Sequence, residues 1–394
     1  MTNSALTLIK GRTATRSSAV RDNRLSAVFF DLLRAALGDV PGELVELNTE
    51  EWLGLHKQAT KQALLGVIFY GLQRVYPDTE QRIPKDLYLK WFYQAEAIRG
   101  LNQTHYELSK KLTSLFAERG AKSVILKGQA NSRIYPDKFI RQTGDVDIWV
   151  AGGRDKVVSL LSQMGLLENA KFSAHEVTLS RDTFGVDVEV HFNYIYDCRN
   201  PFANKRLRQI LSYEIECPVA VDEGFNVASN KFSMLMQLSH IRKHLLGHGV
   251  GCRQIMDYAV LLQASQDSER AEVSQALAST GLKPIAGALM WVLSECFGLK
   301  DEYLLCAPDV SRGRRLLAEI SDDGNFGKNA KRKRGGVFRW WLRNRLHLLR
   351  MLPFDFPEVS WFLLRYWGAF LYYIPKRIYL LYKYKKSPTK SGMT

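Results

Sequence analysis

Two aspartates separated by one residue, Asp145 and Asp147, are the residues of this sequence best suited to metal chemistry. They lie in DVDIWV (145–150), where polar and apolar residues alternate as in a half-buried β-strand. Side chains at i and i+2 of a strand point to one face, about 6.6 Å apart at a rise of about 3.3 Å per residue. Two carboxylates placed in this way can hold a pair of divalent cations, which lie about 3.5–4 Å apart in two-metal phosphoryl-transfer sites. Mg²⁺ favours such oxygen ligands.

A second alternating segment, VDVEVHF (186–192), is the expected source of a third carboxylate. Asp187, Glu189 and His191 share one face of such a strand, and the valines between them share the other. The spacing alone does not choose between Asp187 and Glu189. The spacing does not decide the role of His191 either. This residue could contact a phosphate, orient Glu189, or be an ordinary histidine on a polar face.

Lys127 and Gly128 follow the short β-branched run that begins at Ser123, and a short helix is expected over 129–135, before Pro136. Backbone N–H groups at this turn, the N-terminus of the helix and the lysine could all favour a phosphate group. A D-x-D or Lys-Gly pair alone is common without any function. The order of strand, glycine, helix and two acidic strands is what indicates a site.

The elements that must position these residues form a helix–sheet–helix pattern along the chain. The early region predicts a helix over 25–37 ended by Gly38, one helix from Asn48 or Thr49 through LLGVIFYGL, and a long helix from Pro84 to Glu118. Strands are expected at 123–128, 145–150, 176–180 and 186–192. Helical patterns return from Asn230, in CRQIMDYAVLLQAS, and around 284–298 and 311–320.

These patterns divide the chain into five parts. We expect a disordered tail at 1–24, an N-terminal helical region at 25–120, a sheet-containing core at 121–225, a C-terminal helical region at 226–325 and a basic aromatic tail at 326–394. The Ser, Thr and Arg content of the first residues also resembles an organellar transit peptide, which is the alternative to a disordered tail.

Composition is that of a globular protein, with 46% hydrophobic and 24% charged residues. Five dispersed cysteines without a C-x-x-C pair are typical of a reducing compartment, and they indicate neither a disulfide framework nor a zinc ribbon. The net charge of +15 is concentrated in residues 331–394, where fifteen Lys or Arg stand against Asp355 and Glu358, a net of +13. The basicity therefore belongs to the tail and not to the catalytic body.

The segment LKGQANSRIYPDKFIRQTGDVDIWV (126–150), followed by VDVEVHF, closely resembles the uncharacterised nucleotidyltransferase family of the DNA polymerase beta-like superfamily. In that family an L-K-G turn leads through a helix, a Tyr-Pro and an Arg to G-D-x-D, and then to an acidic-x-His strand. The similarity extends to EEWLGLHKQATKQALLGVIFYGL before the core and to QLSHIRKHLLGHG and RQIMDYAVLL after it. The chain departs from the wider superfamily where Lys127-Gly128 replaces the usual Gly-Gly or Gly-Ser.

The resemblance implies an α+β fold, with a small mixed-sheet nucleotidyltransferase core flanked by N- and C-terminal helical regions. It also implies the reaction, in which an acceptor hydroxyl attacks the α-phosphate of a nucleoside triphosphate and releases pyrophosphate. Mg²⁺ or Mn²⁺ is the implied cofactor and ATP the expected donor. A sugar, a small metabolite, a peptide or a protein could be the acceptor. The alternative is a non-catalytic nucleotide-binding or partner-binding protein that keeps the shape of the site.

The resemblance also assigns roles to individual residues. Asp145 and Asp147 are the implied metal ligands and catalytic residues, and Glu189 is the third acid, a metal ligand and a candidate base for the acceptor hydroxyl. The implied cofactor-binding residues are Lys127, Gly128 at the phosphate turn, Arg141 as a contact to the triphosphate, and Gly144.

Three histidines recur every four residues, at His240, His244 and His248, so one helix face could present all of them. The spacing suits a zinc site, which would make the protein a hydrolase of a different class. Positions 241–243 are Ile, Arg and Lys, however, so the glutamate of H-E-x-x-H is missing and cations lie beside the site. Hydrogen-bonded histidines on a helix that covers the active-site cleft are the favoured interpretation.

The tail combines a basic stripe, formed by Arg339, Arg343, His347 and Arg350, with the aromatic run WFLLRYWGAFLYYI (361–374). This run is too short to span a bilayer, which needs about twenty apolar residues. The tail either lies on an anionic membrane surface or packs onto the body with its charges solvated. Nucleic-acid binding ranks third, after these two interpretations, because no nucleic-acid-reading motif accompanies the charge. The expected location is the cytoplasm, either free or peripheral at the inner face of the membrane.

Overall fold

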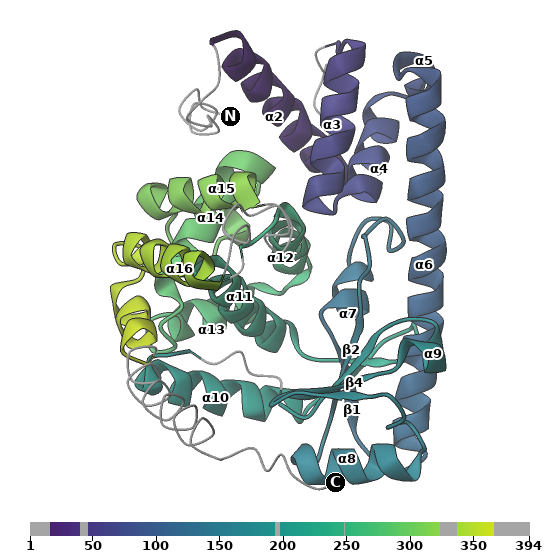
Figure 1. The fold of residues 1–394 in the computed structure, drawn as a ribbon, viewed down its shortest axis with the longest axis vertical. Helices are drawn as coiled ribbons and strands as arrows, with labels where there is room; N and C mark the ends of the chain where they lie inside the picture. The colour runs from purple at the N-terminus through teal and green to yellow at the C-terminus, as the bar shows by residue number, and fades with distance from the viewer. Residues whose placement is uncertain (1–15, 40–45, 194–197, 248, 324–336, 366–394) are drawn as a thin grey trace, which may run out of the picture.

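The computed structural model describes residues 16–39, 46–193, 198–247, 249–323 and 337–365. A mixed β-sheet lies near one end of the molecule, with the N-terminal helices at the other end and the C-terminal helices beside both (Figure 1). The N-terminal helices are α2 (Arg16–Ala36), α3 (Thr49–Gln62), α4 (Leu65–Val75), α5 (Thr79–Arg82) and α6 (Lys85–Ala117). The C-terminal helices are α11 (Asn230–Leu246), α12 (Cys252–Ala264), α13 (Asp267–Ala276), α14 (Lys283–Phe297), α15 (Val310–Asp323) and α16 (Val337–Met351).

Seven strands form the sheet of the described residues, in the order β3-β4-β5-β2-β1-β7-β6. The two central strands that carry the acidic motifs, β2 and β5, are parallel, and β1 pairs antiparallel with β2. The expected fold class, a small mixed sheet flanked by helical regions, is therefore confirmed. The strands are β1 (Ser123–Leu126), β2 (Val146–Val150), β3 (Lys171–Phe172), β4 (Glu176–Leu179), β5 (Val188–His191), β6 (Val219–Ala220) and β7 (Asn226–Val227). The helices of this region are α7 (Gly128–Ser132), α8 (Gly153–Gln163), α9 (Arg181–Phe184) and α10 (Pro201–Ile215).

The two faces of the sheet differ as the alternation in the sequence predicts. Val146, Ile148 and Val150 of β2 are buried in one hydrophobic cluster with residues of β5, the C-terminal half of α6, and α8. The polar partners on β2 and β5 point to the opposite face. Asp147 and Trp149 of β2 lie on this second face, and Trp149 joins the other, larger hydrophobic cluster.

The expected single helix from Asn48 through residue 72 is wrong, because the chain breaks it into α3 and α4. The start is as predicted, with a capping box in which Asn48 and Glu51 each accept from the other's backbone N–H at 3.0 Å. Ala63 then adopts the left-handed conformation, with φ of 54°, and ends α3. The predicted start of the first helix at Leu25 is also wrong. No Gly or Pro interrupts residues 16–24, and α2 begins at Arg16.

Two glycines of α4 allow unusually close packing. A Cβ at Gly71 would lie 2.3 Å from the carbonyl oxygen of Leu32 in α2, and a Cβ at Gly66 would lie 2.5 Å from that of Ile140. Any side chain at either position would therefore collide with backbone. Through Gly66, the N-terminal helices dock directly on the loop that leads into β2.

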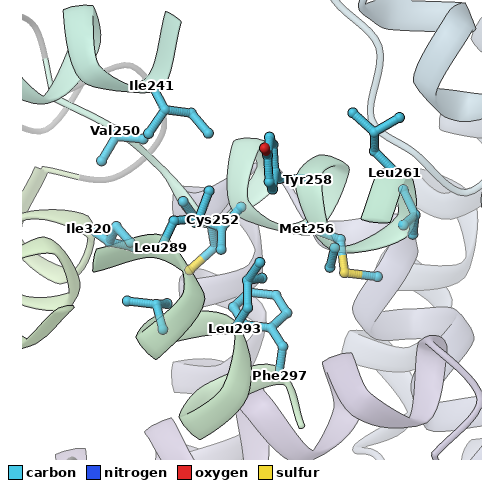
Figure 2. Packing of buried hydrophobic residues seen from close by; sticks show 14 of the residues in the cluster. Ile241, Val250, Cys252, Met256, Tyr258, Leu261, Leu289, Leu293, Phe297 and Ile320 are labelled. Atoms are coloured by element: carbon cyan, nitrogen blue, oxygen red, sulfur yellow. The ribbon is translucent and has the colours of Figure 1, made fainter. Parts of the chain in front are cut away.

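The helical regions before and after the sheet share one hydrophobic cluster, to which α2, α3, α4, α11, α12, α14, α15 and α16 all contribute. Figure 2 shows part of it, with Cys252 and Met256 of α12 facing Leu289 and Leu293 of α14. A single core therefore encloses the second face of the sheet between elements from both ends of the chain. None of the described helices has the length and hydropathy required to cross a membrane.

Candidate active site

Asp147 and Glu189 occupy paired positions on the adjacent parallel strands β2 and β5. His191 lies two residues beyond Glu189 on the same face, and ligand atoms of these three residues all lie within 4.8 Å of one another. Asp147 and His191 are buried, whereas Glu189 is half-buried. The two acidic motifs, distant in sequence, thus meet at the centre of the sheet.

Asp147 is held between two cationic side chains. Its Oδ1 lies 3.1 Å from Nζ of Lys127 and accepts a hydrogen bond of 2.8 Å from Nε2 of His191. Burial alone would raise the pKa of Asp147, but the charge of Lys127 and the bond from His191 outweigh it and hold the pKa well below its usual range. Burial lowers the pKa of His191, but its bonds to Asp147 and Glu189 prevail and raise that pKa to about 9. At neutral pH the imidazole is therefore protonated.

The pKa values of the other two carboxylates, Asp145 and Glu189, are raised because these groups are crowded together. The pKa of Asp145 is raised first by the charge of Asp147 and second by burial. For Glu189, the hydrogen bond with His191 lowers the pKa, but burial and the charges of Asp147 and Asp145 outweigh it and raise the pKa. Carboxylates that repel one another across a shared space are stabilised by a cation placed between them. The carboxylates of Asp147 and Glu189, together with that of Asp145 in the lining of the same pocket, offer the oxygen donors that a divalent cation prefers.

A pocket of about 270 Å³ opens over this cluster, between the sheet on one side and α11 and α12 on the other. The residues assigned by resemblance all line it, namely Lys127, Gly128, Arg141, Gly144, Asp145, Asp147 and Glu189. Asp187 does not, because its side chain is exposed just before β5 begins. His240 also lines the pocket, as expected for a histidine on a helix that covers the cleft. The remaining lining residues were not identified from the sequence, and these are Asn131, Glu176, Gln237, Ile241, Lys243, Arg253, Gln254 and Asp257.

Gly128 and Gly144 have open space on the side where a side chain would be. A Cβ at Gly128 would meet only the carbonyl oxygen of Asp145, at 3.6 Å, and a Cβ at Gly144 would meet nothing within 4 Å. Neither glycine has a positive φ, whereas Lys127 between β1 and α7 does, at 49°. Packing and backbone conformation therefore do not explain these two glycines, and both leave room in the pocket wall for a ligand to approach the backbone.

Arg141, the expected contact to the triphosphate, is engaged in a buried ion pair. Its Nε and Nη2 donate to the two carboxylate oxygens of Asp257, at 2.7 and 2.8 Å, and the hydroxyl of Tyr135 donates to the same carboxylate at 2.7 Å. Although burial opposes both charges, the pairing lowers the pKa of Asp257 and raises that of Arg141. In this geometry the guanidinium fastens the loop before β2 to α12.

Arg253, one helical turn before Asp257, is a second buried guanidinium in the pocket wall. Its Nη1 donates to the carbonyl oxygen of Gln142 at 3.0 Å. Burial, followed by the charge of Arg141, lowers the pKa of Arg253 to about 10, so the side chain remains cationic at neutral pH. Lys243 of α11 also lines the pocket, so Arg253 and Lys243 place positive charge on the helical side, while Lys127 places it beside Asp147.

The helix α6 holds the loop before Asp145 through two buried polar residues. Nδ2 of Asn102 donates to the carbonyl oxygens of Phe139 and Arg141, at 2.8 and 2.7 Å. Nε2 of His105 lies 3.0 Å from the carbonyl oxygen of Gly144. Polar residues in the middle of a long amphipathic helix were a signal in the sequence that could have identified them.

A comparable signal was present in α12. Arg253, Gln254 and Asp257 lie at i, i+1 and i+4, and so share one side of a helix that is otherwise apolar. Cys252 and Met256 point the other way, into the core shown in Figure 2. A buried polar stripe on such a helix needs partners. Arg253 and Asp257 find them in the loop before β2, whereas Gln254 accepts from the backbone N–H of Gly251.

The histidines of α11 are hydrogen-bonded to each other, as favoured. Nε2 of His240 and Nε2 of His244 lie 2.6 Å apart, and His240 lines the pocket. Burial and the charge of Lys127 hold the pKa of His240 well below its usual range, so its ring is neutral. His248 lies outside the described residues. Within the described ranges, the cluster whose ligand atoms lie close enough together to hold a metal ion comprises Asp147, Glu189 and His191, and it includes neither Asp145 nor His240 nor His244.

Comparisons with known proteins bear on this site. A family model described as an uncharacterised nucleotidyltransferase matches residues 48–298. No curated protein sequence matches the chain. Among solved structures, an antigenic nucleotidyltransferase-like protein from Paracoccidioides brasiliensis is similar over 50% of this chain and 94% of that chain, with 17% sequence identity and a TM-score of 0.30. Because the family model covers well over half of the chain and includes every residue of the pocket, this protein belongs to the uncharacterised nucleotidyltransferase family.

Proposed function

We propose that this protein transfers a nucleoside monophosphate from a nucleoside triphosphate, with ATP as the expected donor, to an acceptor hydroxyl. The observation that carries the proposal is the in-register pairing of Asp147 with Glu189, next to Asp145, in a pocket with a cationic opposite wall. Membership of the family supports nucleotidyl transfer in general. The metal-dependent chemistry is inferred from the carboxylates.

Asp145, Asp147 and Glu189 are the residues that would hold Mg²⁺ or Mn²⁺. Bound cations would supply charge neutralisation for the triphosphate and for the attacking oxygen. The fit rests on the donor set, since hard divalent cations bind carboxylate oxygens, and on the mutual repulsion that raises the pKa of Asp145 and Glu189.

The rest of the pocket would bind and orient the substrate. Lys127, Lys243 and Arg253 provide positive charge for the phosphates, and Gly128 and Gly144 leave space for them to approach the backbone. In the reaction, the acceptor oxygen bonds to the α-phosphorus as the bond from that phosphorus to pyrophosphate breaks. Glu189, with its raised pKa, is the group placed to take the proton of the acceptor hydroxyl.

Asp145→Asn and Asp147→Asn test the proposal, with Asp187→Asn as the matched control. Each change removes one negative charge and keeps the volume, but Asp187 is exposed and outside the pocket wall. The thermal stabilisation by ATP with Mg²⁺ should be present in the wild type and in Asp187→Asn, and lost in the two site variants. Transfer from ATP labelled at the α-phosphate to molecules of a cell extract should follow the same ranking.

Two results would count against the proposal. Unchanged stabilisation by Mg²⁺ and ATP in both site variants would mean that Asp145 and Asp147 do not bind the metal. Stabilisation without any transfer, over a range of extracts and nucleotides, would instead favour a protein that binds nucleotide and does not catalyse.

A further inference from the structure

The C-terminal segment 342–365, formed by the end of α16 and a helical stretch over 356–365, has a buried face and an exposed face. Leu348, Met351, Phe354 and Val359 are fully buried in the shared hydrophobic cluster. His347 is also buried, and its Nε2 lies 2.9 Å from the carbonyl oxygen of Leu245 in α11. The inner side of the segment therefore packs onto the rest of the protein. Packing of the tail onto the body was one of the two interpretations of its sequence.

The two acidic residues of the basic tail are both turned inward. The carboxylate of Glu358 accepts hydrogen bonds from the backbone N–H groups of Arg199 and Asn200, at 2.6 and 3.0 Å. Oδ2 of Asp355 lies 3.6 Å from Nη1 of Arg242. Both side chains are buried, so neither contributes negative charge to the outer surface of the segment. These contacts also set the orientation of the helical stretch that follows α16.

The exposed face of the segment is apolar and basic. Leu342, Leu346 and Leu349 repeat at i, i+4 and i+7 along α16, and Phe356, Trp361 and Leu364 are also exposed in the next helical stretch. Phe356 is 68% exposed and Leu364 61%. The charged side chains exposed among them are arginines, including Arg350 and Arg365. An amphipathic element normally turns such residues inward, but here a second apolar side faces solvent.

We propose that this outer face of residues 342–365 docks on the surface of an anionic lipid bilayer. Leucines and aromatic rings at the headgroup level, flanked by arginines, are the composition of interfacial helices. Charge complementarity favours this occupant, because the exposed charged residues of 342–365 are Arg343, Arg350 and Arg365, whereas both acids of the segment are buried. A second copy of the chain that used the same face would bring cations against cations. A nucleic acid would match the charge but would leave the exposed leucines without apolar contact.

The proposal goes beyond nucleotidyl transfer and does not depend on it, since none of these residues lines the pocket. The test is co-sedimentation of the full chain with two kinds of vesicle, one of phosphatidylcholine alone and one of equal parts phosphatidylcholine and phosphatidylserine. The full chain should bind the phosphatidylserine vesicles, bind the neutral ones far more weakly, and dissociate as salt rises.

The double variant Trp361→Ser/Leu364→Ser probes the face itself. Its matched control is Tyr93→Ser/Leu101→Ser on α6, which lies on the other side of the molecule from α16 (Figure 1). Tyr93 and Leu101 are exposed to a similar degree, at 68% and 46%. The first variant should lose roughly tenfold or more in affinity for phosphatidylserine vesicles, because two inserting side chains are removed, and the control should bind as the wild type does.

Equal loss in the two double variants, or no loss in either, would overturn the proposal, and so would equal binding of the wild type to both vesicles. A single-stranded oligonucleotide is the competing ligand in a parallel measurement. If the chain binds the oligonucleotide but not the phosphatidylserine vesicles, the face is a nucleic-acid surface and the lipid assignment is wrong. Far-UV circular dichroism and melting temperature unchanged from wild type would show that the variants are folded.

Discussion

Asp147 and Glu189 lie directly beside each other on parallel strands, in a register that also pairs Trp149 with His191. Neighbouring strands are about 4.8 Å apart, so two carboxylates at paired positions share one small volume on the same face of the sheet. Asp145 adds a third from the residue just before β2. The charges of these residues are coupled, which explains why Asp145 and Glu189 are raised in pKa while Asp147, paired with Lys127 and His191, is lowered.

The third carboxylate can be identified by comparing Glu189, which follows Val188, with Asp187, which precedes it. We expect Glu189→Gln to reduce transfer from α-labelled ATP by about a hundredfold or more, because it removes a metal-binding charge. Asp187→Asn should stay within about threefold of wild type, because its side chain is exposed and does not line the pocket. The opposite ranking in the same assay would transfer the role of third carboxylate to Asp187.

Arg253 should contribute to affinity for the triphosphate. We expect Arg253→Gln to weaken ATP binding by about ten- to a hundredfold, measured by calorimetry with Mg²⁺ present, because a buried cation facing the phosphates is removed. Binding of AMP should change much less, since it lacks the β- and γ-phosphates. Arg206→Gln, an exposed site on α10, is the control for loss of one positive charge. Equal losses for ATP and AMP would mean that Arg253 shapes the pocket and does not contact the outer phosphates.

The Arg141–Asp257 pair should dominate the stability of the loop before β2. Asp257→Asn leaves the buried guanidinium of Arg141 without its counter-charge, and we expect a loss of about 3–5 kcal/mol in the free energy of unfolding, measured in urea. The double variant Arg141→Met/Asp257→Leu should recover much of this loss, because it removes both buried charges. A cost below about 1 kcal/mol for Asp257→Asn would show that the pair is hydrated in solution.

The same pair predicts a pH dependence with a definite sign. The pKa of Asp257 is lowered in the folded protein from its ordinary value of 3.8. The unfolded carboxyl group therefore takes up a proton at higher pH than the folded one, so the stabilisation is complete well above 3.8 and is lost as the pH falls through the folded pKa. The difference in unfolding free energy between wild type and Asp257→Asn should be constant from about pH 7 to about pH 5 and shrink only in stronger acid. A difference that shrank as the pH rose would contradict the assignment.

The C-terminal segment should tolerate truncation at one place and not at another. A chain that ends before Val337 loses Leu348, Met351, Phe354 and Val359 from the core, and its melting temperature should fall by more than about 10 °C. A chain that ends at Arg365 keeps these four residues and should melt within a few degrees of wild type. Equal melting temperatures for the two truncated chains would show that the packing of α16 contributes little to stability.

Local patterns in the sequence were sufficient for four of the seven strands of the described sheet, β1, β2, β4 and β5, and for the acidic residues on them, but the two-residue strands β3, β6 and β7 were not predicted. Alternation with a period of two in 145–150 and 186–192 predicted which residues of β2 and β5 share a face, because neighbouring side chains of a strand must point to opposite faces. The expectation of a half-buried strand was wrong for β2, in which all five residues are buried. The capping box at Asn48 and the long helix after Pro84 were found for the same reason, since both depend on residues close together in the chain. The match to residues 48–298 agrees with the family assigned from the motifs.

Tertiary structure decided the features that depend on residues far apart in the sequence. The left-handed turn at Ala63 follows from how α4 must pack against α2 and the loop at Ile140, and no local signal marked it. The partner of Arg141 is on α12, a helix that reaches the pocket only because the two helical regions share one core. The inward turn of Asp355 and Glu358 likewise depends on Arg242 and on the backbone at Arg199 and Asn200. Periodicity shows which side of an element is apolar, but only the packed structure determines what each side meets, because charge pairing and shape are matched across the whole chain.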